Sequence, residues 1–121
     1  MKVLVLEDSH IRVREFKQRL LEKGWVGTFV ESAMDAIKML KEKKFDLIFL
    51  DHDLGDETYV DTYERNTGSE VARWLNEHPV KAVVVIHSLN LPAAEYMQSL
   101  IKGSYLIPYV WTEERFKAIK A

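Results

Sequence analysis

The chain has 121 residues, about the usual size of a single domain, so we expect one hydrophobic core. Its composition, 47% hydrophobic and 30% charged with only 5 Gly and 3 Pro, excludes a disordered or low-complexity chain. The absence of cysteine excludes disulfide scaffolds, thiolate zinc sites and cysteine nucleophiles, and the net charge of −2 provides no overall basic field for nucleic acid or anionic lipid.

Short apolar runs alternate with amphipathic stretches in the first half of the chain. A continuous apolar run is typical of a strand buried on both faces of a parallel sheet. Ser32 is suited to begin a helix as its N-cap, and Gly24 is suited to end one. The elements predicted here are a strand over residues 3–6, a helix over 11–23, a strand over 25–30, a helix over 33–43 and a strand over 47–50.

The periodicity is lost between His52 and Thr67, where we expect a long acidic and polar loop. Pro92 suits the first turn of a helix, and Thr112 is a candidate N-cap. Pro108 cannot donate a hydrogen bond to a neighbouring strand, so the last strand should lie at a sheet edge. The elements predicted after the loop are a helix over 68–77, a strand over 82–86, a helix over 92–102, a strand over 105–110 and a helix over 113–120.

Five consecutive strand–helix units predict an α/β fold of the flavodoxin-like (βα)5 type, a doubly wound parallel sheet with strand order 2-1-3-4-5. A closed barrel would need about 250 residues. The longest apolar run, residues 82–86, is much shorter than the ~20 residues that cross a bilayer, and the N-terminus has no signal-peptide pattern. We therefore expect a single cytoplasmic domain over residues 1–121 with no membrane partner.

Polar residues follow the first, third and fourth predicted strands. In an open parallel sheet, binding sites form at the carboxyl ends of the strands, and these three strands are neighbours in the predicted order. Their polar side chains should therefore converge on one crevice. They are Glu7 and Asp8 after the first strand, Asp51, His52 and Asp53 after the third, and His87, Ser88 and Asn90 after the fourth.

Several carboxylates in one small site repel each other unless a cation lies among them. Oxygen-rich sites prefer Mg²⁺, so we predict Mg²⁺ bound by Glu7, Asp8, Asp51 and Asp53. Each residue also has a simpler interpretation. A single aspartate at a strand end is often a helix N-cap or a loop hydrogen-bonding group, and His87 could be a histidine satisfied within the core.

Three segments resemble the receiver domain of bacterial two-component signalling. Residues 3–9 resemble the strand and acidic pair that bind Mg²⁺ in that family, and Gly68 matches the start of its third helix. Residues 45–51 resemble the segment that ends in the phosphoacceptor aspartate, which implies that role for Asp51. The resemblance also places Asp53 where the family's third metal ligand contributes its main-chain carbonyl.

Two positions depart from the receiver pattern. His87 stands where receivers carry a threonine or serine, and Ile107 stands where they carry a lysine that binds the phosphoryl group. Without this lysine, an acyl phosphate on Asp51 loses a charge-assisted contact worth about 1.5–3 kcal/mol. Residues 50–54 and 87–90 are instead similar to a divergent branch, proposed to process cyclic phosphates, that presents histidines to a phosphoester.

The first functional hypothesis is a Mg²⁺-dependent phosphoesterase acting on a cyclic phosphate, with a nucleotide or an RNA end as possible substrates. Catalysis would use Asp51 at the metal, His87 as general acid or base and His52 as a second proton-transfer group, while Ser88 and Asn90 bind phosphate oxygens. The long loop would act as a substrate lid through Tyr59, Tyr63 and Arg65.

Two alternatives remain open. The chain could be a stand-alone response regulator in a phosphorelay, phosphorylated on Asp51 by a histidine kinase. With no output or DNA-binding domain after Ala121, it would signal by docking to a protein partner. It could also be a pseudo-receiver that only binds a protein, in which case Mg²⁺ binding is not expected.

Overall fold

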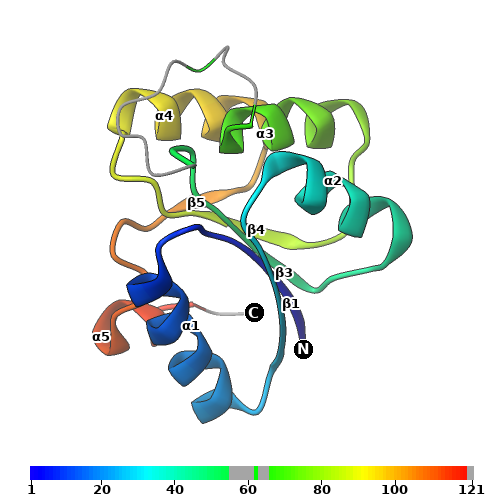
Figure 1. Ribbon diagram of the computed structural model, residues 1–121. Helices are drawn as coiled ribbons and strands as arrows, with labels where there is room; N and C mark the ends of the chain where they lie inside the picture. The colour runs from blue at the N-terminus through cyan, green and yellow to red at the C-terminus, as the bar shows by residue number, and fades with distance from the viewer. Residues whose placement is uncertain (55–61, 63–65, 120–121) are drawn as a thin grey trace.

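The structure, a computed structural model, describes residues 1–54, 62 and 66–119. Strands and helices alternate along this part of the chain (Figure 1). In chain order they are β1 (Lys2–Leu6), α1 (His10–Lys23), β2 (Val26–Val30), α2 (Ala33–Glu42), β3 (Leu47–Leu50), α3 (Gly68–Glu77), β4 (Val83–Ile86), α4 (Leu91–Leu100), β5 (Tyr105–Leu106) and α5 (Glu113–Phe116).

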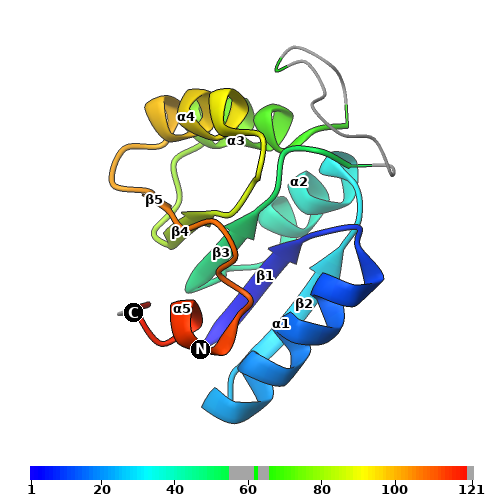
Figure 2. The same cartoon turned by 90° about the vertical axis from the view of Figure 1, so that its left-hand side faces the viewer.

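The strands form one parallel sheet with the order β2-β1-β3-β4-β5, which confirms the predicted flavodoxin-like topology. Figure 2 shows β1 lying between β2 and β3. The strands are in register across the centre of the sheet, where Val5 is opposite Phe49 and Phe49 is opposite Val85. β5 lies at the sheet edge, as the proline at position 108 predicted.

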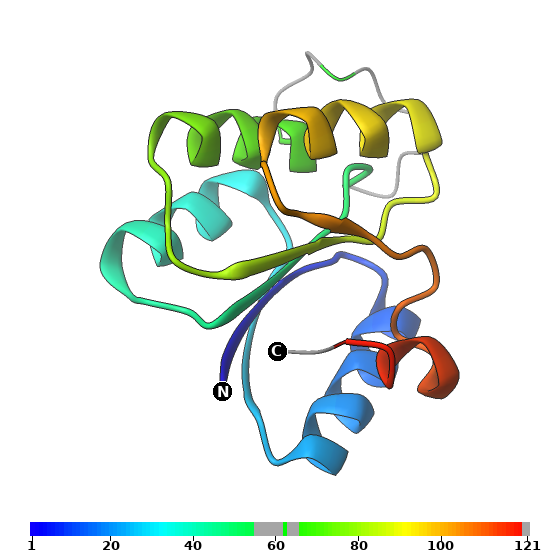
Figure 3. The same ribbon diagram turned by 180° about the vertical axis from the view of Figure 1, so that it is seen from behind.

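Helices cover both faces of the sheet. Helices α2, α3 and α4 lie on one face and α1 and α5 on the other (Figures 1 and 3). Because side chains alternate along a strand, Leu4 and Leu6 pack in the α2–α4 layer, whereas Val3 and Val5 pack in the α1/α5 layer. Each central strand is therefore buried on both sides. Among the described residues, no helix combines the length and apolar character that crossing a bilayer requires.

The predicted helix ends are confirmed for α1 and α2. Gly24 adopts the left-handed conformation with φ of 72°, and its amide donates to the carbonyl oxygens of Leu20 and Leu21. At the start of α2, the Ser32 side chain accepts a hydrogen bond from the Asp35 amide.

The last two elements are shorter than predicted. β5 ends at Leu106 rather than at residue 110, and α5 ends at Phe116 rather than at residue 120. Thr112 precedes α5 but its side chain accepts no cap hydrogen bond, and its hydroxyl donates to the Tyr109 carbonyl oxygen. The sequence pattern extended the strand through Pro108, but the chain turns there.

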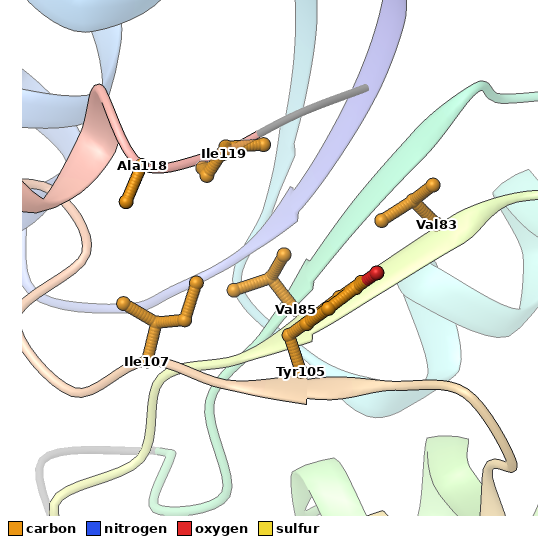
Figure 4. A pocket seen from close by; sticks show the side chains of 6 residues that line it. All are labelled: Val83, Val85, Tyr105, Ile107, Ala118 and Ile119. Atoms are coloured by element: carbon orange, nitrogen blue, oxygen red, sulfur yellow. The ribbon is translucent and has the colours of Figure 1, made fainter.

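The short β5 and α5 leave an apolar pocket of about 120 Å³ beside the sheet edge. Figure 4 shows the side chains of Val85 and Ile107 on one side of this pocket and those of Ala118 and Ile119 on the other. Ile107 thus contributes an apolar surface at the end of β5, where the resemblance to receivers would have placed a lysine.

Candidate functional site

Three polar side chains lie next to each other at the carboxyl ends of the central strands. Glu7, Asp51 and His87 directly follow β1, β3 and β4. The strand register continues through them, since the Asp51 amide donates to the Leu6 carbonyl at 3.2 Å and the His87 amide donates to the Leu50 carbonyl at 3.0 Å. One potential ligand atom from each of the three side chains lies within 4.8 Å of the others. We refer to Glu7, Asp51 and His87 as the three-residue group.

The alternation of side chains along a strand explains why these three residues share one face. Each lies two positions beyond a strand residue that packs in the α1/α5 layer, namely Val5, Phe49 and Val85. Neighbouring strands are about 4.8 Å apart, so three in-register positions bring their side chains within reach of one cation.

Glu7 is held as a buried carboxylate by several donors. Its Oε1 lies 3.1 Å from His87 Nε2, and its Oε2 accepts hydrogen bonds from the amides of Asp8 and Ser9 at 3.1 Å each. Burial favours the neutral acid, but the contacts with His87, Arg12 and the Ser9 amide outweigh it and lower the pKa of Glu7. Glu7 therefore carries a negative charge inside the fold at neutral pH.

The pKa of the Asp51 carboxyl group is shifted in the opposite direction to that of Glu7. Burial, together with the charge of Glu7, raises the pKa of Asp51 to about 7, although His87, Arg12 and the His52 amide act against this rise. The His52 amide donates to Asp51 Oδ1 at 2.8 Å. Near neutral pH, two carboxyl groups at this distance do not both ionise freely, which is the situation that a divalent cation relieves.

His87 is fully buried, and aromatic rings surround it. Its ring centroid lies 5.2 Å from that of Phe16, 5.8 Å from that of Trp111 and 6.5 Å from that of Phe49. Nδ1 has no hydrogen-bond partner among the described residues, so the bond from Nε2 to Glu7 fixes the ring's orientation. The residue thus has the burial of a core histidine and the contacts of a site residue.

The other histidine after a central strand points elsewhere. His52 is also fully buried, but its Nδ1 lies 2.9 Å from the Ser69 hydroxyl at the start of α3, and its Nε2 lies 3.9 Å from Asp53 Oδ1. It belongs to the α3 side of the sheet, as expected for the strand position after Asp51. His52 is therefore near the three-residue group without being part of it.

The remaining predicted site residues surround the three-residue group. Asp8 is half-buried, and Asp53 accepts a hydrogen bond from the Asn90 amide group at 3.3 Å. Ser88 is buried and accepts a hydrogen bond from the Asn90 backbone amide at 3.1 Å. Asn90 also caps α4 through the Ala93 amide. The predicted lid residues Tyr59, Tyr63 and Arg65 lie outside the described residues.

One residue of the site was missed in the sequence. Arg12 Nη1 lies 3.6 Å from Glu7 Oε1 and 3.6 Å from Asp51 Oδ2, and its guanidinium lies 5.1 Å from the centre of the Trp111 ring. The sequence spacing could have identified Arg12, because it precedes the buried Phe16 by four residues and therefore lies on the helix face that turns toward the sheet.

The three-residue group fits a divalent cation. It offers two carboxylate oxygens and an imidazole nitrogen close together, and one of the carboxyl groups is disfavoured as an anion by the other. Mg²⁺ prefers oxygen ligands and usually retains several waters, so Glu7 and Asp51 are the residues that would hold it. Asp8 and Asp53 do not belong to the three-residue group.

Comparisons with known proteins agree with this architecture. The model of the family described as the cyclic-phosphate processing receiver domain matches residues 2–103. No curated protein matches the sequence.

Several solved structures share the fold. A CheY-like response regulator receiver domain from Methylobacillus flagellatus is 19% identical over 99% of this chain and 98% of its own, with a TM-score of 0.70. The response regulator TrrA from Thermotoga maritima, solved with Mg²⁺ and BeF, is 19% identical over 96% and 94%, with a TM-score of 0.68. A Saccharomyces cerevisiae receiver domain, solved with a histidine phosphotransfer protein, is 15% identical over 97% and 83%, with a TM-score of 0.73.

Proposed function

Because this chain belongs to the family of cyclic-phosphate processing receiver domains, we propose that it is a metal-dependent phosphoesterase that hydrolyses a cyclic phosphate. The observation that carries the proposal is the three-residue group, in which two buried carboxyl groups and an imidazole lie within 4.8 Å. The name of the matching family supports the same substrate class.

The proposed reaction is the hydrolysis of one ester bond. A water oxygen forms a bond to phosphorus, one ring P–O bond breaks, the water loses a proton, and the departing oxygen gains one. Bound Mg²⁺ would neutralise phosphate charge and lower the pKa of a coordinated water. The chain must then supply a cation site, a proton-transfer group and donors to the phosphate oxygens.

His87 is proposed as the proton-transfer group through its Nε2 atom. Its hydrogen bond to Glu7 aims Nε2 at the carboxylate pair and stabilises the ring when it is protonated. The surrounding rings of Phe16 and Trp111 keep bulk water from the other side of the imidazole. Glu7 is therefore both a metal ligand and the residue that orients His87.

The surrounding residues are assigned supporting roles. Ser88 and Asn90 would donate to phosphate oxygens, and for this the Asn90 amide group would exchange its present hydrogen bond to Asp53. Asp8 and Asp53 would complete the metal environment. His52 would act as a second proton-transfer group, and its contact with Ser69 holds its ring in place.

The test is a turnover assay with Mg²⁺ on nucleoside 2′,3′-cyclic phosphates, 3′,5′-cyclic nucleotides and their linear monoesters, followed by ³¹P NMR. His87→Gln keeps a hydrogen-bond donor toward Glu7 but cannot transfer protons, so turnover should fall about 10²–10⁴-fold. The matched control is His78→Gln at the exposed end of α3, which should leave turnover unchanged. Absence of turnover by the wild-type chain, or full activity of His87→Gln, would refute the proposal.

A second candidate is a response regulator phosphorylated on Asp51 by a histidine kinase. The position of Asp51 at the end of β3 and the similarity to response regulator receiver domains favour it. Incubation with acetyl phosphate or phosphoramidate and Mg²⁺, followed by intact mass spectrometry, would reveal an acyl phosphate that Asp51→Asn abolishes. A chain that neither accepts phosphate, nor hydrolyses a phosphoester, nor binds millimolar Mg²⁺ would instead be a protein-binding pseudo-receiver.

A further inference from the structure

Arg12 occupies a helix position that should be apolar. It lies four residues before Phe16 and eight before Leu20, and both of these side chains are buried against the sheet. Residues at this spacing share one helix face, so an arginine here carries its charge into the layer between α1 and the sheet. Such a placement costs desolvation energy, which the contacts of the guanidinium must offset.

The contacts of Arg12 lead directly to the three-residue group. Its guanidinium meets both carboxyl groups at 3.6 Å and lies over the Trp111 ring. In the described part of the chain, no other lysine or arginine forms an ion pair with Glu7 or Asp51. Among the described residues, Arg12 is therefore the positively charged arginine or lysine side chain that contacts the three-residue group.

The pairing between Arg12 and the carboxyl groups is loose. A distance of 3.6 Å exceeds the 2.7–3.2 Å of an ordinary hydrogen bond, and one nitrogen faces both acids. The side chain is 32% exposed, whereas Glu7 is fully buried, so Arg12 faces both the group and the solvent. Among the described residues, no ordinary hydrogen bond engages its five N–H donors, so the guanidinium can bind another anion.

The charges of the site indicate that this anion is a phosphate group. Glu7 and Asp51 alone offset the charge of one divalent cation, and neither Asp8 nor Asp53 adds a positive charge, so a negatively charged phosphoester needs a fixed cation such as Arg12 in order to bind here. A guanidinium adds a positive charge and a planar fork that matches two phosphate oxygens. The end of β5 offers no substitute, because Ile107 lines the apolar pocket with Ala118 and Ile119 (Figure 4).

We propose that Arg12 is the phosphate-binding residue of this site, held over Trp111 and released from Glu7 and Asp51 when a divalent cation takes its place between them. This inference deepens the proposed function and rests on it for the substrate class. Trp111 gives the guanidinium a fixed surface to lie on, which limits the conformational entropy lost when it binds phosphate.

The experiment measures the binding of inorganic phosphate in saturating Mg²⁺ by isothermal titration calorimetry. Arg12→Gln should weaken phosphate binding about 10- to 100-fold. Arg12→Lys keeps the charge but not the planar guanidinium, so its phosphate affinity should lie between those of the wild type and Arg12→Gln. The control is Arg14→Gln, an equal loss of charge at an exposed position of α1, which should bind like the wild type.

Fluorescence of Trp111 provides a second readout. In a Trp25→Phe/Trp74→Phe background, Trp111 is the remaining tryptophan, and phosphate with Mg²⁺ should change its emission as Arg12 shifts. The change should be lost in Arg12→Gln.

Two results would overturn the inference: no phosphate binding by the wild type, or phosphate binding by Arg12→Gln that is unchanged while its Mg²⁺ binding is unchanged or tighter. The last result would mean that Arg12 only neutralises the acids. If Arg12→Gln fails to fold, Arg12→Met, which keeps the apolar stem without the charge, takes its place, and unchanged phosphate binding by Arg12→Met is the overturning result. A chain that binds phosphate through Arg12 but hydrolyses no cyclic phosphate would refute the proposed function and leave this inference intact.

Discussion

Replacing Asp51 by asparagine should make the metal-free protein more stable at alkaline pH than the wild type. In the folded chain, burial raises the pKa of Asp51 from 3.8 to about 7. The folded state therefore holds a proton that the unfolded state has released, so stability falls as the pH rises between these two values. The asparagine side chain of the variant has no proton to lose, and the amide of His52 can still donate to its oxygen.

The size of the effect follows from the shift of the Asp51 pKa. About 3 pH units at 1.36 kcal/mol each correspond to roughly 4 kcal/mol over the whole titration of Asp51. Between about pH 5 and about pH 8, the difference in unfolding free energy between Asp51→Asn and wild type should change by about 3 kcal/mol in favour of the variant.

Urea denaturation in EDTA, followed by circular dichroism at several pH values, measures this difference. The control is Glu95→Gln, which removes an exposed carboxyl group of α4 and should give a profile parallel to that of the wild type. If Asp51→Asn and wild type also give parallel profiles between these pH values, Asp51 is not a buried acid with a raised pKa, and the electrostatic description of the site is wrong.

Further predictions concern metal, packing and capping. About 10 mM Mg²⁺ should raise the melting temperature of the wild type by a few degrees near pH 8, and Glu7→Gln should abolish this rise in differential scanning fluorimetry. Gly68→Ala would place a Cβ far inside van der Waals contact with the Asp51 carbonyl oxygen, so urea denaturation should show a loss of about 3 kcal/mol or more, or no folded protein. Asn90→Ala removes the cap on the Ala93 amide and should cost about 1 kcal/mol by the same method, whereas Asn90→Ser should recover most of it.

The architecture could be predicted from the sequence because short apolar runs, which indicate strands, alternate clearly with amphipathic stretches, which indicate helices. Uninterrupted apolar runs indicate strands buried on both faces, and the structure places helices on both sides of β1, β3 and β4. The position of Gly24 fixed the end of α1 for a physical reason, since the left-handed conformation there favours glycine. The polar residues at the strand ends could be identified for the same reason, because topology alone brings these ends together.

The details of the site were harder to predict. A list of polar residues after each strand does not show that Glu7, and not its neighbour Asp8, lies in the three-residue group. The spacing to Phe16 places Arg12 on the sheet-facing side of α1, but the sequence pattern does not show which side chains of the sheet it contacts. The shortness of β5 was missed because Ile107 and Val110 continue the apolar pattern after the chain has left the strand.

The parallel arrangement also determines when the site forms during folding. β1 and β2 are joined by a single helix, whereas Glu7 and His87 are 80 positions apart in the chain. Closing the longer loops costs more conformational entropy, so we expect the contacts between β1, β3 and β4 to form late during folding. A ligand bound by residues that come together only at this stage should prolong the lifetime of the native state while leaving the refolding rate almost unchanged.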